Sequence, residues 1–122
     1  MLAQDHDAVV VADDDPSLRL LCRVNLEQDG YRVLEAESAT ELELLLGQED
    51  VRLVLLDVRF GSDDGLVVAR MLRERYPEVA IALFTGTAPM LSADARAAAD
   101  AVLSKPFSLE ELSEIARRLA RA

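Results

Sequence analysis

The sequence predicts an α/β domain in which helices cover both faces of a five-stranded parallel sheet. Two observations carry this prediction. Short, continuous apolar segments alternate five times with longer segments whose apolar residues recur at helical spacing. Such strands and such an alternation are typical of parallel sheets joined by right-handed crossovers. With 122 residues, 51% of them hydrophobic, residues 1–122 are expected to form a single domain, with residues 1–7 as a polar tail.

The composition restricts the setting and the partners of this domain. The single Cys22 excludes an intrachain disulfide, which fits a reduced, cytoplasmic setting. The sequence shows no secretory segment and no apolar run that could cross a bilayer, so no membrane association is expected. The net charge is -10, and residues 1–64 carry 16 acidic and 5 basic residues. Such a domain should repel nucleic acid, whereas its acidic half can attract cations such as Mg²⁺.

The first predicted strand, Ala8–Ala12, is an unbroken apolar run that is too short for a helix. Asp13–Asp15 and Pro16 follow at once, and Asp before Pro is a helix start signal. We therefore expect a helix from about Pro16 to Asp29, which Gly30 is placed to end. The residues predicted to share its buried face are Leu18, Leu21, Cys22 and Leu26.

The second predicted strand, Tyr31–Glu35, is less uniformly apolar, which favours a position near a sheet edge. Ser38 can cap the following helix, and Glu41 stands three residues later, as in a capping box. Gly47 is expected to end this helix. Its buried stripe is predicted to consist of Ala39, Leu42, Leu45 and Leu46.

The rest of the chain continues the alternation. The remaining strands are predicted at Leu53–Asp57, Val79–Phe84 and Ala101–Ser104. Between them we expect a helix ended by Pro77, with Leu66, Ala69, Leu72, Arg73 and Tyr76 along one face, and a weak helix at about Pro89–Ala99. The last helix is expected at about Leu109–Arg121, capped by Ser108, with Leu109, Leu112, Ala116 and Leu119 facing inward.

Polar residues stand at the carboxyl ends of four predicted strands. These are Asp13 and Asp14 after the first strand, Asp57 at the end of the third, Thr85 after the fourth and Lys105 after the fifth. The carboxyl ends of parallel strands share one edge of the sheet, and ligands of open α/β sheets bind just beyond it. We therefore expect three carboxylates, a hydroxyl and an ammonium group to lie close together.

This set of groups fits phosphoryl transfer. Carboxylates placed together repel one another unless a cation relieves them, and Mg²⁺ binds carboxylates while also accepting a phosphoryl oxygen. Lys105 would add a positive charge, Thr85 a hydrogen-bond donor, and Asp57 the nucleophilic oxygen of an aspartyl phosphate. Lys105 is the only Lys among 13 basic residues, and an ammonium group is not interchangeable with a guanidinium in a tight site.

Each of these residues also has an ordinary structural explanation. Asp13–Asp15 could merely cap a helix, and Asp57 could begin a turn. Thr85 could be a plain strand exit, and Lys105 could belong to a surface turn. The coincidence of four polar strand ends in this order favours a functional site over four separate explanations.

The motifs at these strand ends resemble those of response regulator receiver domains, and the likeness covers residues 8–121. The motifs are Val-Val-Ala-Asp13-Asp14-Asp15-Pro16, Leu-Leu-Asp57 with Asp64-Gly65 following, Phe-Thr85-Gly86, and Leu-Ser-Lys105-Pro106-Phe107. The resemblance implies a flavodoxin-like (βα)5 fold with strand order 2-1-3-4-5. It also implies a two-component phosphorelay in which a histidine kinase or histidine phosphotransfer protein phosphorylates the domain, which then acts on an effector domain or a downstream protein. Such a domain is not a turnover enzyme for an external substrate.

The resemblance also assigns roles at the acidic end of the site. It makes Asp57 the phosphoacceptor. It places Mg²⁺ or Mn²⁺ on the carboxylates of Asp57 and Asp14 and on the main-chain carbonyl of Arg59. Asp13 would bind the metal mainly through water.

The opposite side of the site would contact the phosphoryl group. The resemblance gives this role to Thr85, Gly86 and Lys105, with Thr85 moving toward the phosphoryl group in the active state. It also implies a cis bond between Lys105 and Pro106.

The chain departs from the usual receiver pattern at two positions. Val102 stands three residues before the Lys, where these domains usually carry an aromatic residue, so the usual coupling between the Thr and a ring is not expected. Gly61 replaces a common Pro and should loosen the loop after the phosphoacceptor. Arg59 and Thr87 are two further candidate modulators. We hypothesise that Arg59 screens the phosphoryl group or pairs with a neighbouring acid, and so alters the dephosphorylation rate.

Three alternatives stand beside this interpretation. The first is a receiver-like protein-interaction module that works without phosphorylation. It would act through the face formed by the fourth helix, the fifth strand and the fifth helix, which phosphorylation would switch in an ordinary receiver domain. Val102 favours this alternative, and the intact site residues oppose it. A hydrolase with an aspartyl nucleophile would usually carry a second Asp where this chain has Arg59. A flavin or dinucleotide site would need a Gly-rich turn after the first strand, and none follows it.

Overall fold

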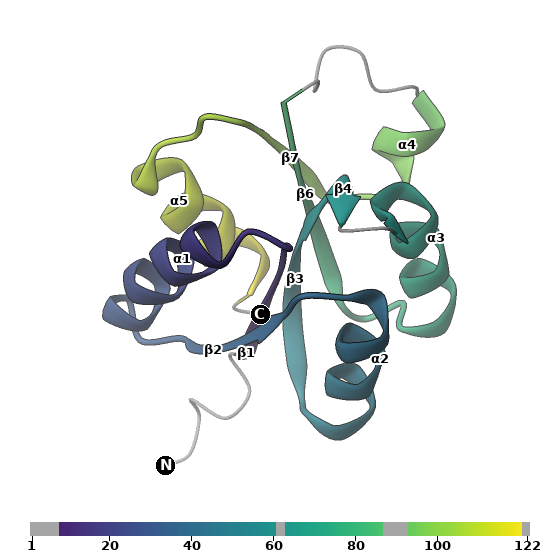
Figure 1. The fold of residues 1–122 in the computed structure, drawn as a ribbon, viewed down its shortest axis with the longest axis horizontal. Coiled ribbons are helices and arrows are strands. Elements are labelled where there is room, and N and C mark those ends of the chain that lie inside the picture. Colours follow the sequence, from purple (N-terminus) through teal and green to yellow (C-terminus); the bar gives the residue numbers. More distant parts are fainter. Residues whose placement is uncertain (1–7, 61–62, 87–92, 121–122) are drawn as a thin grey trace.

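The computed structural model describes residues 8–60, 63–86 and 93–120 and contains a five-stranded sheet between two layers of helices (Figure 1). The strands are β1 (Ala8–Ala12), β2 (Arg32–Ala36), β3 (Val51–Asp57), β6 (Ala80–Thr85) and β7 (Ala101–Ser104). They pair in parallel in the order β2-β1-β3-β6-β7. This confirms the predicted strand order and the edge position of the second strand.

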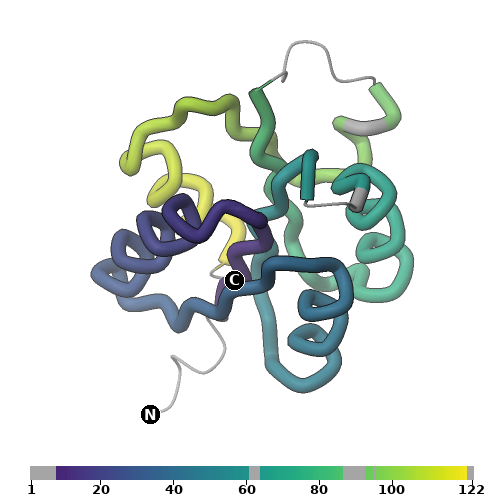
Figure 2. Tube along the Cα trace, in the orientation of Figure 1, coloured from purple at the N-terminus to yellow at the C-terminus, as the bar shows by residue number. Residues whose placement is uncertain are grey.

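The helices divide between the two faces of the sheet. α1 (Pro16–Gln28) and α5 (Leu109–Leu119) cover one face, while α2 (Ala39–Gln48) and α3 (Gly65–Arg75) cover the other, with the short α4 (Ala93–Ala97) beside α3 (Figure 1). Figure 2 shows the last helix, α5, near the yellow end of the chain, lying next to the first helix, α1. The side-chain amide of Asn25 in α1 donates to the Ser113 hydroxyl of α5 at 3.0 Å, so these two helices are in direct contact.

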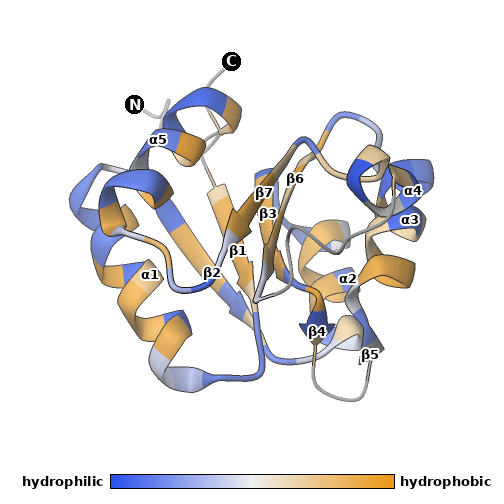
Figure 3. Ribbon diagram, turned by 90° about the horizontal axis from the view of Figure 1, so that it is seen from above, coloured by the Kyte–Doolittle hydropathy of each residue, from blue (hydrophilic) through white to orange (hydrophobic). Residues whose placement is uncertain are grey.

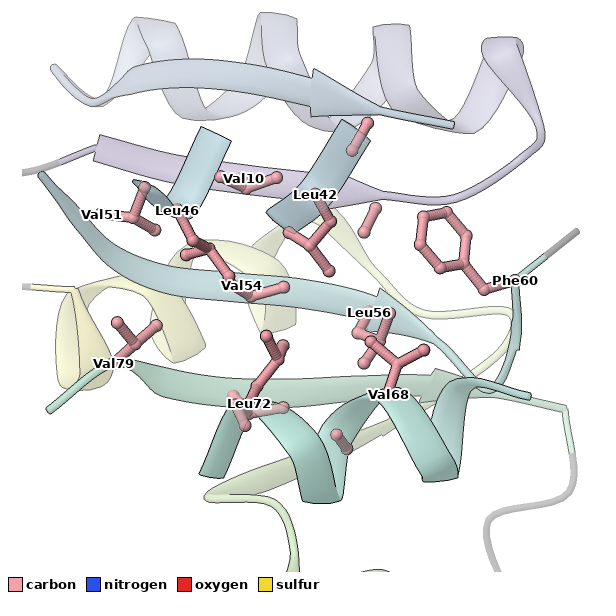
Figure 4. Close-up of a cluster of buried hydrophobic side chains, with 14 of the residues drawn as sticks. Val10, Leu42, Leu46, Val51, Val54, Leu56, Phe60, Val68, Leu72 and Val79 are labelled. Atoms are coloured by element: carbon pink, nitrogen blue, oxygen red, sulfur yellow. The ribbon is translucent and has the colours of Figure 1, made fainter. Parts of the chain in front are cut away.

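Alternate residues of a strand point to opposite faces of the sheet. Because the central strands are continuous apolar runs, both faces of the sheet are apolar. Of the buried residues of β3, Leu53 and Leu55 pack on the α1 and α5 side, and Val54 and Leu56 on the α2 and α3 side. Figure 4 shows the apolar cluster on the α2 and α3 side, in which Leu42, Leu46, Leu72 and other side chains pack against β3. In Figure 3 the central strands are largely orange, whereas the helices mix orange and blue residues; Leu20 and Val24 of α1 are among the exposed apolar residues.

Two residues predicted to face the core are exposed instead. Leu21 in α1 is 47% exposed and Leu109 in α5 is 41% exposed. Cys22 and Leu26, one helical turn apart, are the buried residues of α1, and Leu21 lies a residue to the side of this line. Leu109 is the first residue of α5, whose buried residues are Leu112, Ile115 and Ala116.

The helix boundaries agree with the signals in part. Gly30 has a φ of 96°, a left-handed conformation that confirms its role in ending α1. The prediction for Gly47 is wrong, because α2 continues to Gln48. The capping box predicted for α2 is only half formed: Ser38 accepts from the Glu41 amide at 3.2 Å, but the Glu41 carboxylate accepts from the residue before the cap.

The last two predicted helices are shorter in the described residues than the sequence suggested. α4 ends at Ala97, and positions 89–92 of the predicted helix lie outside the described residues. α5 ends at Leu119, and residue 121 also lies outside them. The predicted cap of α5 is confirmed, with a complete capping box between Ser108 and Glu111.

Candidate functional site

Asp57 is the last residue of β3 and its carboxylate lies at the carboxyl edge of the sheet. Its Oδ1 accepts a hydrogen bond from the Arg59 amide at 3.1 Å, and its Oδ2 lies 3.3 Å from Nζ of Lys105. A pocket of about 350 Å³ opens here, lined by Asp57, Val58, Arg59, Thr85, Gly86 and Lys105. The structure thus brings together the residues predicted at the ends of the third, fourth and fifth strands.

Asp13 directly follows β1, the neighbour of β3 in the sheet, and so lies beside Asp57. Its side chain is 1% exposed, and its Oδ1 accepts the Asp15 amide at 2.9 Å while its Oδ2 lies 3.3 Å from Lys105 Nζ. Burial raises the pKa of the Asp13 carboxyl; the charge of Asp57 also raises it, and these two effects outweigh the hydrogen bond from Asp15 and the attraction of Lys105. Asp13 is therefore a carboxylate that a further cation would stabilise.

A divalent cation fits the acidic side of this site. The carboxylates of Asp13, Asp14 and Asp57 offer oxygens that lie within 4.8 Å of one another. Hard cations such as Mg²⁺ prefer oxygen ligands of this kind, and the buried carboxylate with a raised pKa is unfavourable without one. Arg59 lines the adjoining pocket, while the role of its main-chain carbonyl as a ligand stays a prediction.

Lys105 stands between the two buried carboxylates. Its Nζ lies 3.3 Å from Asp13 Oδ2 and 3.3 Å from Asp57 Oδ2. Burial lowers the pKa of the Lys105 ammonium, but the charges of Asp13 and Asp57 outweigh this effect and raise it. Lys105 is therefore a fixed cation in the pocket, and its bond to Pro106 is cis, as the resemblance to receiver domains implied.

Thr85 and Gly86 form the pocket wall at the end of β6. Thr85 is buried and Gly86 is exposed at the rim. The Lys105 amide donates to the Thr85 carbonyl at 2.8 Å, so the pairing of β6 with β7 brings Thr85 and Lys105 to the same pocket. Thr87, predicted as a modulator, lies outside the described residues, as does Gly61.

The sequence did not predict the close packing at Gly65. After β3 the chain forms a short antiparallel ribbon of β4 (Arg59–Phe60) and β5 (Asp63–Asp64), and Gly65 then begins α3. A Cβ at Gly65 would lie 2.2 Å from the Asp57 carbonyl oxygen and 2.7 Å from that of Val58. Only a residue without a side chain allows α3 to start here, and the Asp64-Gly65 pair was the sequence signal that could have indicated it.

The ordinary helix-capping role falls to a different Asp. The Asp15 carboxylate caps α1, accepting from the Ser17 amide at 2.9 Å and the Leu18 amide at 3.4 Å. The cap therefore accounts for Asp15 and leaves Asp13 and Asp14 available to a cation. Asp57 does accept a turn hydrogen bond from Arg59, as its ordinary explanation requires, but its second oxygen faces Lys105.

Of Val102, Arg59 and Cys22, only Arg59 lines the pocket at Asp57. Val102 in β7 is half-buried and packs against the apolar cluster on the α2 and α3 side, and Arg59 is exposed. Cys22 is buried, and burial raises the pKa of its thiol to about 12. Cys22 is thus a core residue, as the sequence predicted, and its raised pKa makes it a poor nucleophile.

Within the described residues, every helix is too short or too polar to pass through a lipid bilayer.

Known proteins are similar to this chain in sequence and in fold. The family described as response regulator receiver domain matches residues 9–117. The transcriptional regulatory protein AruR of Pseudomonas aeruginosa is 38% identical over 120 residues, covering 93% of this chain and 49% of AruR. The chain spans about half the length of the curated relatives it matches.

Two solved structures extend the likeness to three dimensions. The response regulator TrrA from Thermotoga maritima, in complex with Mg²⁺-BeF, aligns with a TM-score of 0.83 at 30% identity, covering 91% of this chain and 96% of that one. The receiver domain of NtrX from Brucella abortus aligns with a TM-score of 0.79 at 26% identity, covering 91% and 95%. The family match, the strand order and the acidic pocket agree, and the chain belongs to the response regulator receiver domain family.

Proposed function

We propose that Asp57 is the residue through which this receiver domain accepts a phosphoryl group, with Mg²⁺ bound by Asp57, Asp14 and, through water, Asp13. The observation that carries this proposal is the position of the Asp57 carboxylate. It lies 3.3 Å from the Lys105 ammonium and lines an open pocket, with oxygens of the other two carboxylates within 4.8 Å. A nucleophilic oxygen, a cation site and a fixed positive charge are the groups that phosphoryl transfer requires.

In the proposed reaction an Asp57 oxygen forms the bond to phosphorus while the bond from phosphorus to the donor's histidine nitrogen breaks. Bound Mg²⁺ or Mn²⁺ would neutralise charge on the phosphoryl oxygens. Lys105 would exchange its contact with the Asp57 carboxylate for one with the phosphoryl group. Thr85 and Gly86 line the same pocket and would donate hydrogen bonds to the phosphoryl oxygens.

The metal site is proposed to include the Arg59 main-chain carbonyl. The exposed Arg59 side chain, together with Thr87 and Val102, would modulate the lifetime or the output of the phosphorylated form. Because Val102 cannot act as an aromatic switch, movement of Thr85 would be transmitted by the packing of Val102 against its apolar cluster.

The wider setting follows from the family. We propose that the donor is a histidine kinase or a histidine phosphotransfer protein in the cytoplasm, and that the domain does not turn over an external substrate. AruR is a transcriptional regulatory protein, and this chain corresponds to 49% of it. We therefore propose that output passes through an effector domain or a downstream protein, by way of the face formed by α4, β7 and α5, and that the acidic receiver domain does not itself bind nucleic acid.

The test is the intact mass of the full chain after incubation with phosphoramidate, with and without Mg²⁺. We expect a Mg²⁺-dependent gain of one phosphoryl group. Asp57→Asn should abolish this gain, whereas Asp64→Asn, which changes another Asp of the same loop and can still cap α3, should retain it. A gain that persists in Asp57→Asn would move the acceptor elsewhere, and no gain under any condition would favour a module that works without phosphorylation.

A further inference from the structure

Arg19 of α1 connects the metal-binding end of β1 to the end of β2. Its side chain is 13% exposed. The guanidinium nitrogen Nη1 donates to the main-chain carbonyl of Asp13 at 2.7 Å, and Nε donates to Glu35 Oε1 at 2.9 Å. A planar guanidinium holds such donors in a fixed relation, so the two bonds tie the Asp13 carbonyl to a carboxylate of the neighbouring strand.

The Asp13 backbone is therefore held from two sides. Its N–H donates to the Ala36 carbonyl at 3.1 Å, and its carbonyl accepts from Arg19. The carbonyl of Asp13 belongs to the same planar peptide unit as the N–H of Asp14. Holding that plane fixes the direction in which the chain leaves Asp13 and the starting point of the Asp14 side chain.

Glu35 is in turn held as an anion. Its second oxygen accepts from Arg23 at 2.9 Å. Burial raises the pKa of Glu35, but the hydrogen bonds from Arg23 and Arg19 outweigh it and lower that pKa overall. The Arg19 guanidinium thus has a charged partner that orients it toward Asp13.

We propose that Arg19 is a positioning residue for the metal site, which holds the Asp13–Asp14 peptide so that both carboxylates are placed before Mg²⁺ binds. This inference rests on the proposed function, because it concerns the same cation site. Groups that orient metal ligands from outside the coordination sphere typically change metal affinity by about 10-fold to 100-fold.

Charge and geometry predict opposite effects for Arg19. A guanidinium close to the acidic cluster repels Mg²⁺, so its removal would tighten metal binding if charge alone mattered. If Arg19 positions the ligands, its removal weakens binding despite the lost repulsion. Arg19→Lys separates the two effects, because it keeps the charge but loses the rigid pair of donors.

The experiment is a Mg²⁺ titration of the full chain, followed by backbone amide NMR shifts, for the wild type, Arg19→Lys, Arg19→Ala and Arg75→Ala. We expect about 10-fold weaker binding for both Arg19 variants. Arg75→Ala is the control: it also removes one positive charge from a helix, but the Arg75 guanidinium pairs with Glu43 rather than with Asp13 or Glu35. We expect its affinity to remain within about twofold of the wild type.

The outcomes separate this inference from the proposed function. Wild-type affinity in Arg19→Lys, or tighter binding in Arg19→Ala, would overturn the positioning role and leave the metal site intact. Absence of Mg²⁺ binding in the wild type would overturn the metal site and the inference with it. Should Arg19→Ala fail to fold, Arg19→Lys decides, with its thermal unfolding midpoint as the measure of an intact fold.

Discussion

Asp13 and Asp57 end neighbouring strands of one sheet, but their surroundings differ. The N–H, carbonyl and both carboxylate oxygens of Asp13 meet partners from β2, α1, the following loop and Lys105. The carboxylate of Asp57 meets the Arg59 amide and Lys105, and it also lines an open pocket. One edge of the sheet thus carries two different carboxylates: Asp13 is held by the protein on all sides, whereas Asp57 is accessible to a reactant.

The largest effect is expected from a change in the backbone beneath Asp57. Gly65→Ala should destabilise the domain by about 3 kcal/mol, because the new Cβ would lie 2.2 Å from the rigid Asp57 carbonyl. Urea unfolding would measure the loss. Gly47→Ala is the control, since a Cβ there meets nothing within 4 Å and Ala stabilises a helix by up to about 1 kcal/mol relative to Gly. Equal stability of Gly65→Ala and the wild type would contradict the close approach.

The next largest effect should come from the cation shared by the two carboxylates. Lys105→Met keeps much of the apolar stem but removes the charge, and we expect the rate of Asp57 phosphorylation by phosphoramidate to fall about 100-fold. Intact mass against time would measure it. Arg118→Met removes an exposed charge of α5 and should leave the rate unchanged. A similar rate in Lys105→Met would mean that Lys105 only balances the buried carboxylates.

A smaller effect should distinguish Asp13 by its response to pH. Because burial and Asp57 raise its pKa, the folded protein binds this proton more tightly than the unfolded chain does. The stability that protonated Asp13 contributes to the folded protein is fully present below the ordinary carboxyl pKa. It is lost as the pH rises through the raised pKa of the folded state. Without metal, the free energy of unfolding of the wild type should therefore fall over this interval relative to that of Asp13→Asn.

Urea titrations in EDTA at a series of pH values would compare these two proteins. Mg²⁺ added in excess of the EDTA should then stabilise the wild type more than Asp13→Asn, since the ion neutralises the buried carboxylate. Parallel pH profiles for both proteins would show that Asp13 does not titrate differently in the folded state.

The smallest effect is expected from the exposed side chain next to Asp57. Arg59→Ala should shorten the lifetime of the aspartyl phosphate about threefold, because an exposed cation interacts only weakly with a neighbouring charge. Loss of the phosphorylated mass over time would measure this lifetime. Arg70→Ala, an exposed charge on α3, serves as the comparison. An unchanged lifetime in Arg59→Ala would exclude its screening role.

The sequence was sufficient to predict the strands and the grouping of polar residues at one edge of the sheet, because both follow from local patterns. The apolar runs ended at Asp13, Asp57, Thr85 and Lys105, and parallel pairing alone brings such ends to one edge. Helix start signals were equally local, as the caps at Asp15 and Ser108 show. Strand order followed from the resemblance, and the structure confirms it.

Other features depend on contacts that no local pattern specifies. The exposure of Leu21 and Leu109 depends on how far the neighbouring element reaches over each helix. Gly47 has the usual character of a helix stop, but α2 continues past it. The bonds from Arg19 to Asp13 and Glu35 join three elements, so only the folded arrangement reveals them.

The contact between α1 and α5 has a consequence for the order in which the chain can fold. The hydrogen bond from Asn25 to Ser113 joins residues 88 positions apart, and the apolar cluster around Cys22 also includes Leu112. Closing such a long loop is slow compared with forming local turns. During synthesis, α1 must therefore leave part of its apolar face open to solvent until α5 emerges. We expect pulse-labelled hydrogen exchange to show that the amides of α1 and α5 become protected in the same kinetic step.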